Sequence, residues 1–296
     1  MNSLHQTPKR ELWGKWRIAW LTDHNVQEVN ELLKTSEIDG IGVSPYSGFS
    51  LKNIHLLERL EPIQGLVIPY PEGMDLSVLN DFSTLQFLCL GELRQPLDFR
   101  LFHQLRDLRI YWNKEDHLPD GSLVMETFSV HNYKSKKANL VDLPVFERLN
   151  TLHLVKANCE SLFGIEKFGA LSKLELGYCS KLASLANLEG VTLEQIEIEG
   201  CKKIVDFSKL RSCPRLSKIV IDGCGSIPSL DFLSECSSLR EFRFVNTEIQ
   251  DGNMMPLVNL ERVGFIAKRK YSHTPEEITS LISYRQMNSN KSHEGT

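Results

Sequence analysis

The chain has 296 residues, and its 34 basic and 38 acidic side chains give a formal net charge of −4. This balance argues against a nucleic-acid-binding protein, which usually carries a concentrated basic stripe. No apolar stretch approaches the roughly 20 residues that a membrane-spanning helix needs, and the N-terminal segment lacks the apolar core of a signal peptide. We therefore expect a soluble, cytoplasmic protein that binds neither nucleic acid nor a membrane.

The N-terminal segment precedes any repeat. Residues 1–10 are interpreted as a tail. Residues 11–37 combine an aromatic-rich stretch with a helical stripe of apolar side chains: Trp13, Trp16, Ile18 and Trp20, then Val26, Val29, Leu32 and Leu33. An array of stacked repeats exposes its core at each end unless a further segment covers it. We interpret residues 11–37 as that N-terminal cap.

From residue 38 to residue 266 one apolar pattern, Leu-x-x-Leu-x-Leu, returns eleven times at intervals of 20 to 25 residues. A period in this range is typical of a solenoid, in which each repeat stacks on the previous one. Positions 4 and 6 of each block are apolar and alternate with solvent-facing positions 3, 5 and 7, which predicts a strand with one buried face. The blocks begin at Ile38, Ile63, Leu85, Leu105, Met125, Leu149, Leu171, Leu193, Leu216, Leu239 and Leu260.

In these blocks the chain resembles leucine-rich-repeat proteins. The resemblance implies an α/β fold, a right-handed solenoid or horseshoe. One parallel strand per repeat would lie on its concave face, with short helices and loops on its convex side. Helical returns are expected at residues 52–61 and 76–83. The resemblance also implies a recognition surface rather than a catalyst.

The cysteines fit the same architecture. In the family, the turn after each strand carries Asn or Cys, whose side chain satisfies backbone groups, and Cys179, Cys201 and Cys224 match that position. We interpret them as small buried hydrophobic residues. A metal site would need closely spaced pairs such as C-x-x-C, and the sequence contains none. Disulfides would need an oxidising compartment, for which the sequence carries no signal.

The repeat pattern weakens between Tyr111 and Leu149, where the sequence is rich in loop residues and includes Lys134, Lys136 and Lys137. Loops of repeat proteins often project beside the binding face, but a tolerated surface insertion explains this segment equally well.

A C-terminal capping helix is expected within residues 267–285. Thr274 has the place of an N-cap, Pro275 follows at the first helical position, and Glu277 completes a capping box. Ile278, Leu281 and Ile282 would close the last repeat. Residues 286–296 are polar and are expected to form a disordered tail.

Two groups of side chains are predicted on the solvent-facing side of the strands. The first is aromatic and basic, a composition typical of binding hot spots: Phe87, Arg109, Tyr111, Trp112 and His131. The second is acidic and includes one histidine: His153, Glu175, Glu197, Glu199 and Asp222. Isolated exposed aromatics are also normal, and Lys173 and Lys218 would partly neutralise the acidic group, so an ordinary solvated face remains an alternative for both.

No catalytic or metal-binding motif accompanies these residues. His131, His153 and Glu175 could converge as metal ligands, but they lack the spacing of known zinc motifs. Phosphate-binding, dinucleotide-binding and serine-nucleophile motifs are also missing from the sequence. We expect no catalytic residues, no metal and no cofactor.

The sequence thus favours a non-enzymatic protein-binding module that uses the concave sheet and the adjoining loops. Within this class, an intracellular inhibitor or immunity-type protein that neutralises a basic partner suits the acidic group. A scaffold or adaptor in a signalling complex, or a non-catalytic subunit of an enzyme, is the alternative.

Overall fold

A computed structural model describes residues 8–94, 96–115, 117–118 and 124–293. The predicted tail at residues 1–10 lies mostly outside the described residues. The chain divides into two compact units. Unit 1 comprises residues 1–131 and 144–147, and unit 2 comprises residues 132–143 and 148–296.

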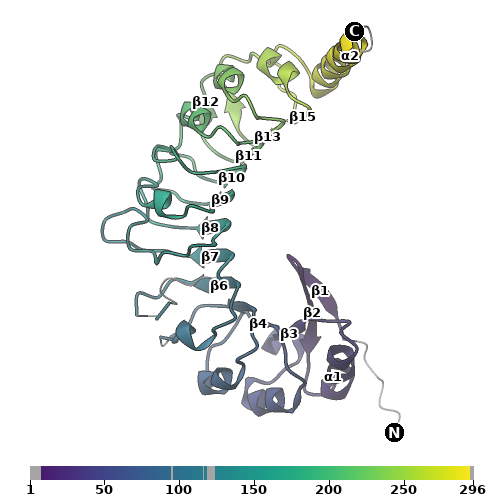
Figure 1. Cartoon of the computed structure of the whole chain (residues 1–296), viewed down its shortest axis with the longest axis vertical. Helices are drawn as coiled ribbons and strands as arrows, with labels where there is room; N and C mark the ends of the chain where they lie inside the picture. The colour runs from purple at the N-terminus through teal and green to yellow at the C-terminus, as the bar shows by residue number, and fades with distance from the viewer. Residues whose placement is uncertain (1–7, 95, 116, 119–123, 294–296) are drawn as a thin grey trace. The chain divides into compact units, whose positions relative to one another are not determined.

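The strands of unit 1 follow one another in sequence order (Figure 1). β1 pairs antiparallel with β2, and every later pairing from β2 to β7 is parallel. The strands are β1 (Arg10–Trp13), β2 (Trp16–Leu21), β3 (Gly40–Val43), β4 (Gly65–Ile68), β5 (Phe87–Leu90), β6 (Asp107–Tyr111) and β7 (Thr127–His131).

The strands of unit 2 are also stacked in parallel, and in Figure 1 their return segments lie on the side away from the sheet. They are β8 (Thr151–Val155), β9 (Lys173–Gly177), β10 (Gln195–Glu199), β11 (Lys218–Asp222), β13 (Glu241–Val245) and β15 (Arg262–Gly264). A separate parallel pair joins β12 (Ser226–Ile227) to β14 (Glu248–Ile249).

The predicted register is confirmed within each unit. Position 5 of one repeat faces position 5 of the next: Gly42, Val67, Cys89, Arg109 and Ser129 in unit 1, and His153, Glu175, Glu197, Val220, Arg243 and Gly264 in unit 2. Positions 4 and 6, such as Leu174 and Leu176, are buried in every repeat except the last, where Val263 at position 4 is half-buried. One parallel strand per repeat with the leucine pattern inside is the leucine-rich-repeat solenoid that the sequence predicts.

The return segments are mainly 3-10 helices rather than α-helices. Repeats of this length leave few residues for the return, and short helical pieces in proteins are often 3-10. The predicted returns at 52–61 and 76–83 are of this type. The 3-10 segments are η1 (Pro45–Ser47), η2 (Leu51–Arg59), η3 (Leu76–Asp81), η4 (Phe99–Leu101), η5 (Ile165–Lys167), η6 (Ser208–Ser212), η7 (Asp231–Glu235) and η8 (Met255–Asn259), beside the α-helices α1 (Val26–Lys34) and α2 (Pro275–His293).

The cysteines after the strands of unit 2 are buried, as predicted. The Sγ atoms of Cys179, Cys201 and Cys224 each lie 3.6 Å from a backbone carbonyl oxygen of an earlier strand, at Leu154, Leu176 and Ile198. Burial raises the pKa of the Cys224 thiol to about 12, so this group stays protonated and can donate. These thiols donate hydrogen bonds to backbone carbonyl groups inside the coil.

The C-terminal helix α2 begins with the predicted capping box. The backbone N–H of Thr274 donates to Glu277 Oε2 at 2.8 Å, and the N–H of Glu277 donates to Thr274 Oγ1 at 3.3 Å. Ile278 and Ile282 are buried. The helix continues to His293, so the described residues 286–293 are helical where a disordered tail was expected. Helix propagation costs little once the first turns are fixed, which explains the extension.

The hairpin β1–β2 does more than cover one end of unit 1. The Trp16 ring stacks on the Phe87 ring, with 5.7 Å between centroids and 7° between planes. Trp16 Nε1 donates to Asp107 Oδ2 at 3.2 Å, and Lys15 Nζ lies 3.3 Å from Glu126 Oε2. The tip of the hairpin therefore lies over the side of β5 and β6 that was predicted to face solvent.

Phe87 is consequently buried, and its predicted exposure on a binding face is wrong. It belongs to an apolar cluster with Trp16, Ile18 and Val67. The sheet makes room for the hairpin with glycines: a Cβ on Gly42 would lie 2.8 Å from the ring of Trp20, and one on Gly65 would lie 3.0 Å from Ile18 Cδ1.

Substitution of Leu174 by alanine tests the inside–outside register. Leu174 is fully buried in the ladder, so Leu174→Ala should lower the free energy of unfolding by about 2–5 kcal/mol. The neighbouring Glu175 faces out of the core, so Glu175→Ala should change it by less than about 1 kcal/mol. Chemical denaturation of both variants measures the difference, and equal losses would contradict the register.

Substitution of Trp16 tests the hairpin contact. Trp16 is 5% exposed, and Trp16→Ala should cost about 3–5 kcal/mol through lost packing against Phe87. Leu12 lies in the same hairpin but is 75% exposed, so Leu12→Ala is the matched control and should leave stability within about 0.5 kcal/mol. A Trp16→Ala protein as stable as the control would show that the hairpin does not pack on the sheet.

Candidate functional site

Three of the five residues in the predicted aromatic group lie together at the carboxyl ends of β6 and β7. The rings of Tyr111 and His131 are 5.0 Å apart between centroids, and the backbone N–H of Trp112 donates to the carbonyl of His131 at 2.7 Å. Tyr111 is 36% exposed. This group is a small aromatic surface that solvent reaches.

Arg109 has a structural role beside this surface. Its guanidinium donates two hydrogen bonds to the buried Asp107, at 3.0 and 3.1 Å, and lies 5.0 Å from the centroid of the Phe87 ring. Asp107 also accepts the hydrogen bond of Trp16. Arg109 therefore helps to hold the hairpin contact, a role that the sequence pattern does not indicate.

A second aromatic pair in unit 1 was not predicted from the sequence. Tyr46 and Tyr70 are 83% and 53% exposed, and their rings meet edge to face with 4.8 Å between centroids. Tyr70 occupies position 8 of its repeat. Tyr46 lies in η1 beyond the strand block, so the period-two pattern carries no signal for it.

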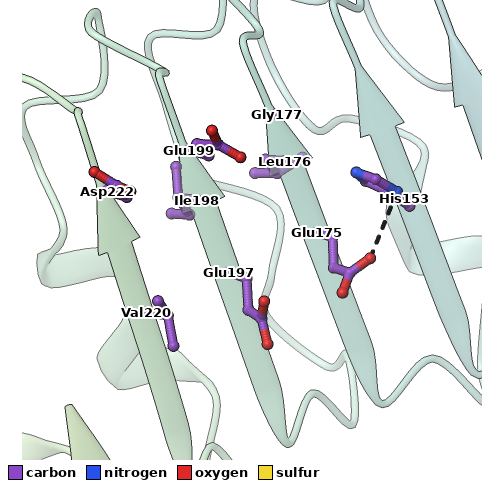
Figure 2. A pocket seen from close by; sticks show the side chains of 9 residues that line it. All are labelled: His153, Glu175, Leu176, Gly177, Glu197, Ile198, Glu199, Val220 and Asp222. Atoms are coloured by element: carbon purple, nitrogen blue, oxygen red, sulfur yellow. Dashed lines mark ion pairs between the residues drawn. The ribbon is translucent and has the colours of Figure 1, made fainter. Parts of the chain in front are cut away.

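The acidic group of unit 2 forms one hollow. Its volume is about 310 Å³, and all five predicted residues line it: His153, Glu175, Glu197, Glu199 and Asp222. Figure 2 shows these side chains on one face of neighbouring strands. The structure thus brings together every residue of this predicted group.

Two of the four carboxylates, those of Glu175 and Glu197, pair with lysines at position 3 of β9 and β11. Lys173 Nζ lies 2.5 Å from Glu175 and 3.6 Å from Glu197, and Lys218 Nζ lies 3.3 Å from Glu197. Burial lowers the pKa of Lys173, but the hydrogen bonds and charges of Glu175 and Glu197 outweigh it and raise the pKa above its usual value. His153 Nδ1 lies 3.5 Å from Glu175 Oε2 (dashed line in Figure 2).

Glu199 and Asp222 meet neutral donors instead. The Tyr178 hydroxyl donates to Glu199, and the Asn246 amide donates to Asp222 at 3.0 Å. In the described part of the chain, neither carboxylate forms an ion pair. The negative charge of the hollow is therefore concentrated at position 7, where the strands end.

The backbone after the strands shapes this edge. Position 8 is left-handed in successive repeats, with φ of 54° at Tyr178, 63° at Gly200, 56° at Gly223 and 49° at Asn246. A Cβ on Gly200 would lie 2.6 Å from the Tyr178 ring. The missing side chain lets the ring of Tyr178 lie over the next repeat, which brings its hydroxyl to Glu199.

The described residues include no group of three or more His, Cys, Asp or Glu side chains that could hold a metal ion. Of His131, His153 and Glu175, the last two contact each other.

No helix in the described ranges has both the length and the apolar character needed to cross a bilayer.

Comparison with known proteins adds one similarity of fold. No protein-family model matches the chain, and no curated protein matches it. Among solved structures, it is similar to an internalin, InlF, from Listeria monocytogenes, with 17% sequence identity and a TM-score of 0.36. The match covers 77% of this chain and 81% of that chain. The assignment as a leucine-rich-repeat solenoid rests on the strand order and register described above.

Proposed function

We propose that the chain is a non-enzymatic protein-binding module, and that the hollow of unit 2 holds a partner protein with a basic surface. The observation that carries this proposal is the charge of Glu199 and Asp222, which the described residues offset with neutral donors alone. Complementary charge steers association and selects partners, so an acidic hollow favours a basic surface. Glu199 is exposed and Asp222 is half-buried, and neither belongs to the apolar core, which leaves both residues open to a binding role.

The aromatic surface of Tyr111, Trp112 and His131 is a second proposed contact. Tyrosine and tryptophan dominate binding hot spots because they bury a large area at a small entropy cost. Tyr111 is accessible here, whereas Phe87 lies under the hairpin. The proposed contact in unit 1 therefore starts at β6.

As a finer proposal, we infer that the protein is a cytoplasmic inhibitor of the immunity type, which covers the basic active site of a toxin or another enzyme. Free, buried thiols suit a reducing compartment, and an acidic hollow suits a basic catalytic surface. Co-expression with the captured enzyme should restore the growth that the enzyme suppresses. Capture without restored growth would favour the scaffold or adaptor role.

Charge reversal at the hollow tests the binding role. The 296-residue chain is used to capture the partner from its native cells, and the affinity is then measured with the purified partner. Glu199→Lys combined with Asp222→Lys should weaken binding at least about tenfold, because two attractive contacts become repulsive. Raising the salt concentration should weaken binding by the wild type and so reduce the difference in affinity between the wild type and the charge-reversed variant.

A matched control separates this effect from total charge. Glu235→Lys combined with Glu261→Lys makes the same change of charge at exposed positions of unit 2 outside the hollow. This control should bind as the wild type does. Equal binding by all three proteins, with unchanged melting temperatures, would exclude the hollow as the site, and loss of affinity in Tyr111→Ala would then place the contact on the aromatic surface.

A further inference from the structure

A second hollow of unit 2 lies beside the acidic one. Its volume is about 300 Å³, and its lining is Phe244, Val245, Asn246, Thr247, Ile266 and Lys268. Val245 is 36% exposed and Ile266 is 60% exposed. Two aliphatic side chains thus face solvent from neighbouring repeats, and neither fills the core.

The two hollows belong to one row of side chains. Glu199 pairs in register with Asp222, and Asp222 pairs with Val245 on the next strand. Asn246 Nδ2 donates to Asp222 Oδ1 at 3.0 Å, so a residue that lines the apolar hollow contacts the acidic one. Ile266 follows β15 at the same repeat position. Position 7 therefore presents carboxylates on two strands and aliphatic side chains on the next two repeats.

Two basic residues belong to the repeats of the apolar hollow. Lys268 lines the hollow itself, two residues after Ile266 in the chain. The Arg243 side chain, on β13, pairs with Glu241 at the start of the strand, where its Nε is 2.8 Å from Glu241 Oε1. A partner that lies along the row therefore meets negative charge at one end and an apolar surface at the other, and this difference distinguishes the two directions in which a segment can lie.

We propose that this row recognises a basic–apolar segment of the partner protein, with a lysine or arginine held by Glu199 and Asp222 and an aliphatic side chain on Val245 and Ile266. The inference rests on the proposed function and names the chemistry of the partner segment. Two observations support the inference together: the charge of the carboxylates and the exposed aliphatic pair beside them. A ligand bound by charge alone would leave the apolar hollow empty.

Strand geometry sets the spacing of the two anchors. Adjacent strands lie about 4.8 Å apart, so the centres of the carboxylate pair and the aliphatic pair are about 10 Å apart. An extended segment advances about 3.3 Å per residue and turns every second side chain to the same face. Three residues would span about 10 Å but would turn the two side chains to opposite faces, so the cation and the aliphatic residue should be two or four positions apart. Lys268 in the lining of the apolar hollow disfavours a second cation close to the aliphatic residue.

Selection from a random library of 12-residue peptides displayed on phage, with the immobilised full chain as bait, tests this inference. The enriched peptides should share a lysine or arginine and an aliphatic residue at one of these spacings. A synthetic peptide of that sequence should bind the wild type, and its affinity should fall at least about tenfold with Glu199→Gln/Asp222→Asn and with Val245→Ser/Ile266→Ser.

The control variant is Val205→Ser/Met255→Ser, which changes two side chains of unit 2 that are 53% and 46% exposed and lie outside both hollows. It should bind the peptide as the wild type does. Circular dichroism of every variant checks the fold, and the single change Ile266→Ser, at the more exposed position of the pair, gives the decisive comparison if a double variant is unstable.

The outcomes separate this inference from the proposed function. Basic peptides that lack an aliphatic residue, and that bind the serine variants unchanged but not Glu199→Gln/Asp222→Asn, would overturn the two-anchor inference and leave the acidic site standing. Peptides that bind every variant equally would overturn both. An absence of enrichment above background would overturn the inference, whereas the charge-reversal experiment with the native partner would still decide the proposed function.

Discussion

Stacking of alternate apolar side chains between parallel strands is the interaction on which the rest of the structure depends. Leu174 and Leu176 of β9 pair in register with the equivalent residues of β8 and β10, and all of these residues are buried. Stability in such an array is a sum of nearest-neighbour contacts, so each terminal strand needs a cover of another kind. In unit 2, helix α2 supplies this cover with Ile278 and Ile282.

The cover at the start of unit 1 changes the use of the sheet face itself. The hairpin places Trp16 on Phe87, and glycines at positions 42 and 65 leave room for Trp20 and Ile18. The equivalent face of unit 2 carries Glu175 and Glu197 and stays accessible. The same strand positions are thus packed in the first repeats of unit 1 and accessible in unit 2, which is consistent with the binding site proposed in unit 2.

The features that follow from the period-two pattern of the strands are predicted well from the sequence. The register and the acidic hollow both follow from counting positions, because an in-line stack brings equal positions together. The contact of Trp16 with Phe87 has no such signal, since the two residues are far apart in sequence and belong to different patterns. The glycines are the one available clue: glycine inside a strand often marks the close approach of another segment. The 3-10 form of the returns depends on packing and length rather than on any motif.

Position along the strand decides which carboxylates remain available to a partner. Lysines at position 3 of β9 and β11 reach position 5, which lies about 7 Å away on the same face, and pair with Glu175 and Glu197. Position 7 lies about 13 Å from position 3, beyond that reach, and the left-handed residue that follows ends the strand. Glu199 and Asp222 therefore lie beyond the reach of these lysines, at the ends of their strands and next to Val245. Because Glu199 and Asp222 lie outside the apolar core, substitutions at these two positions should leave the stack of strands undisturbed.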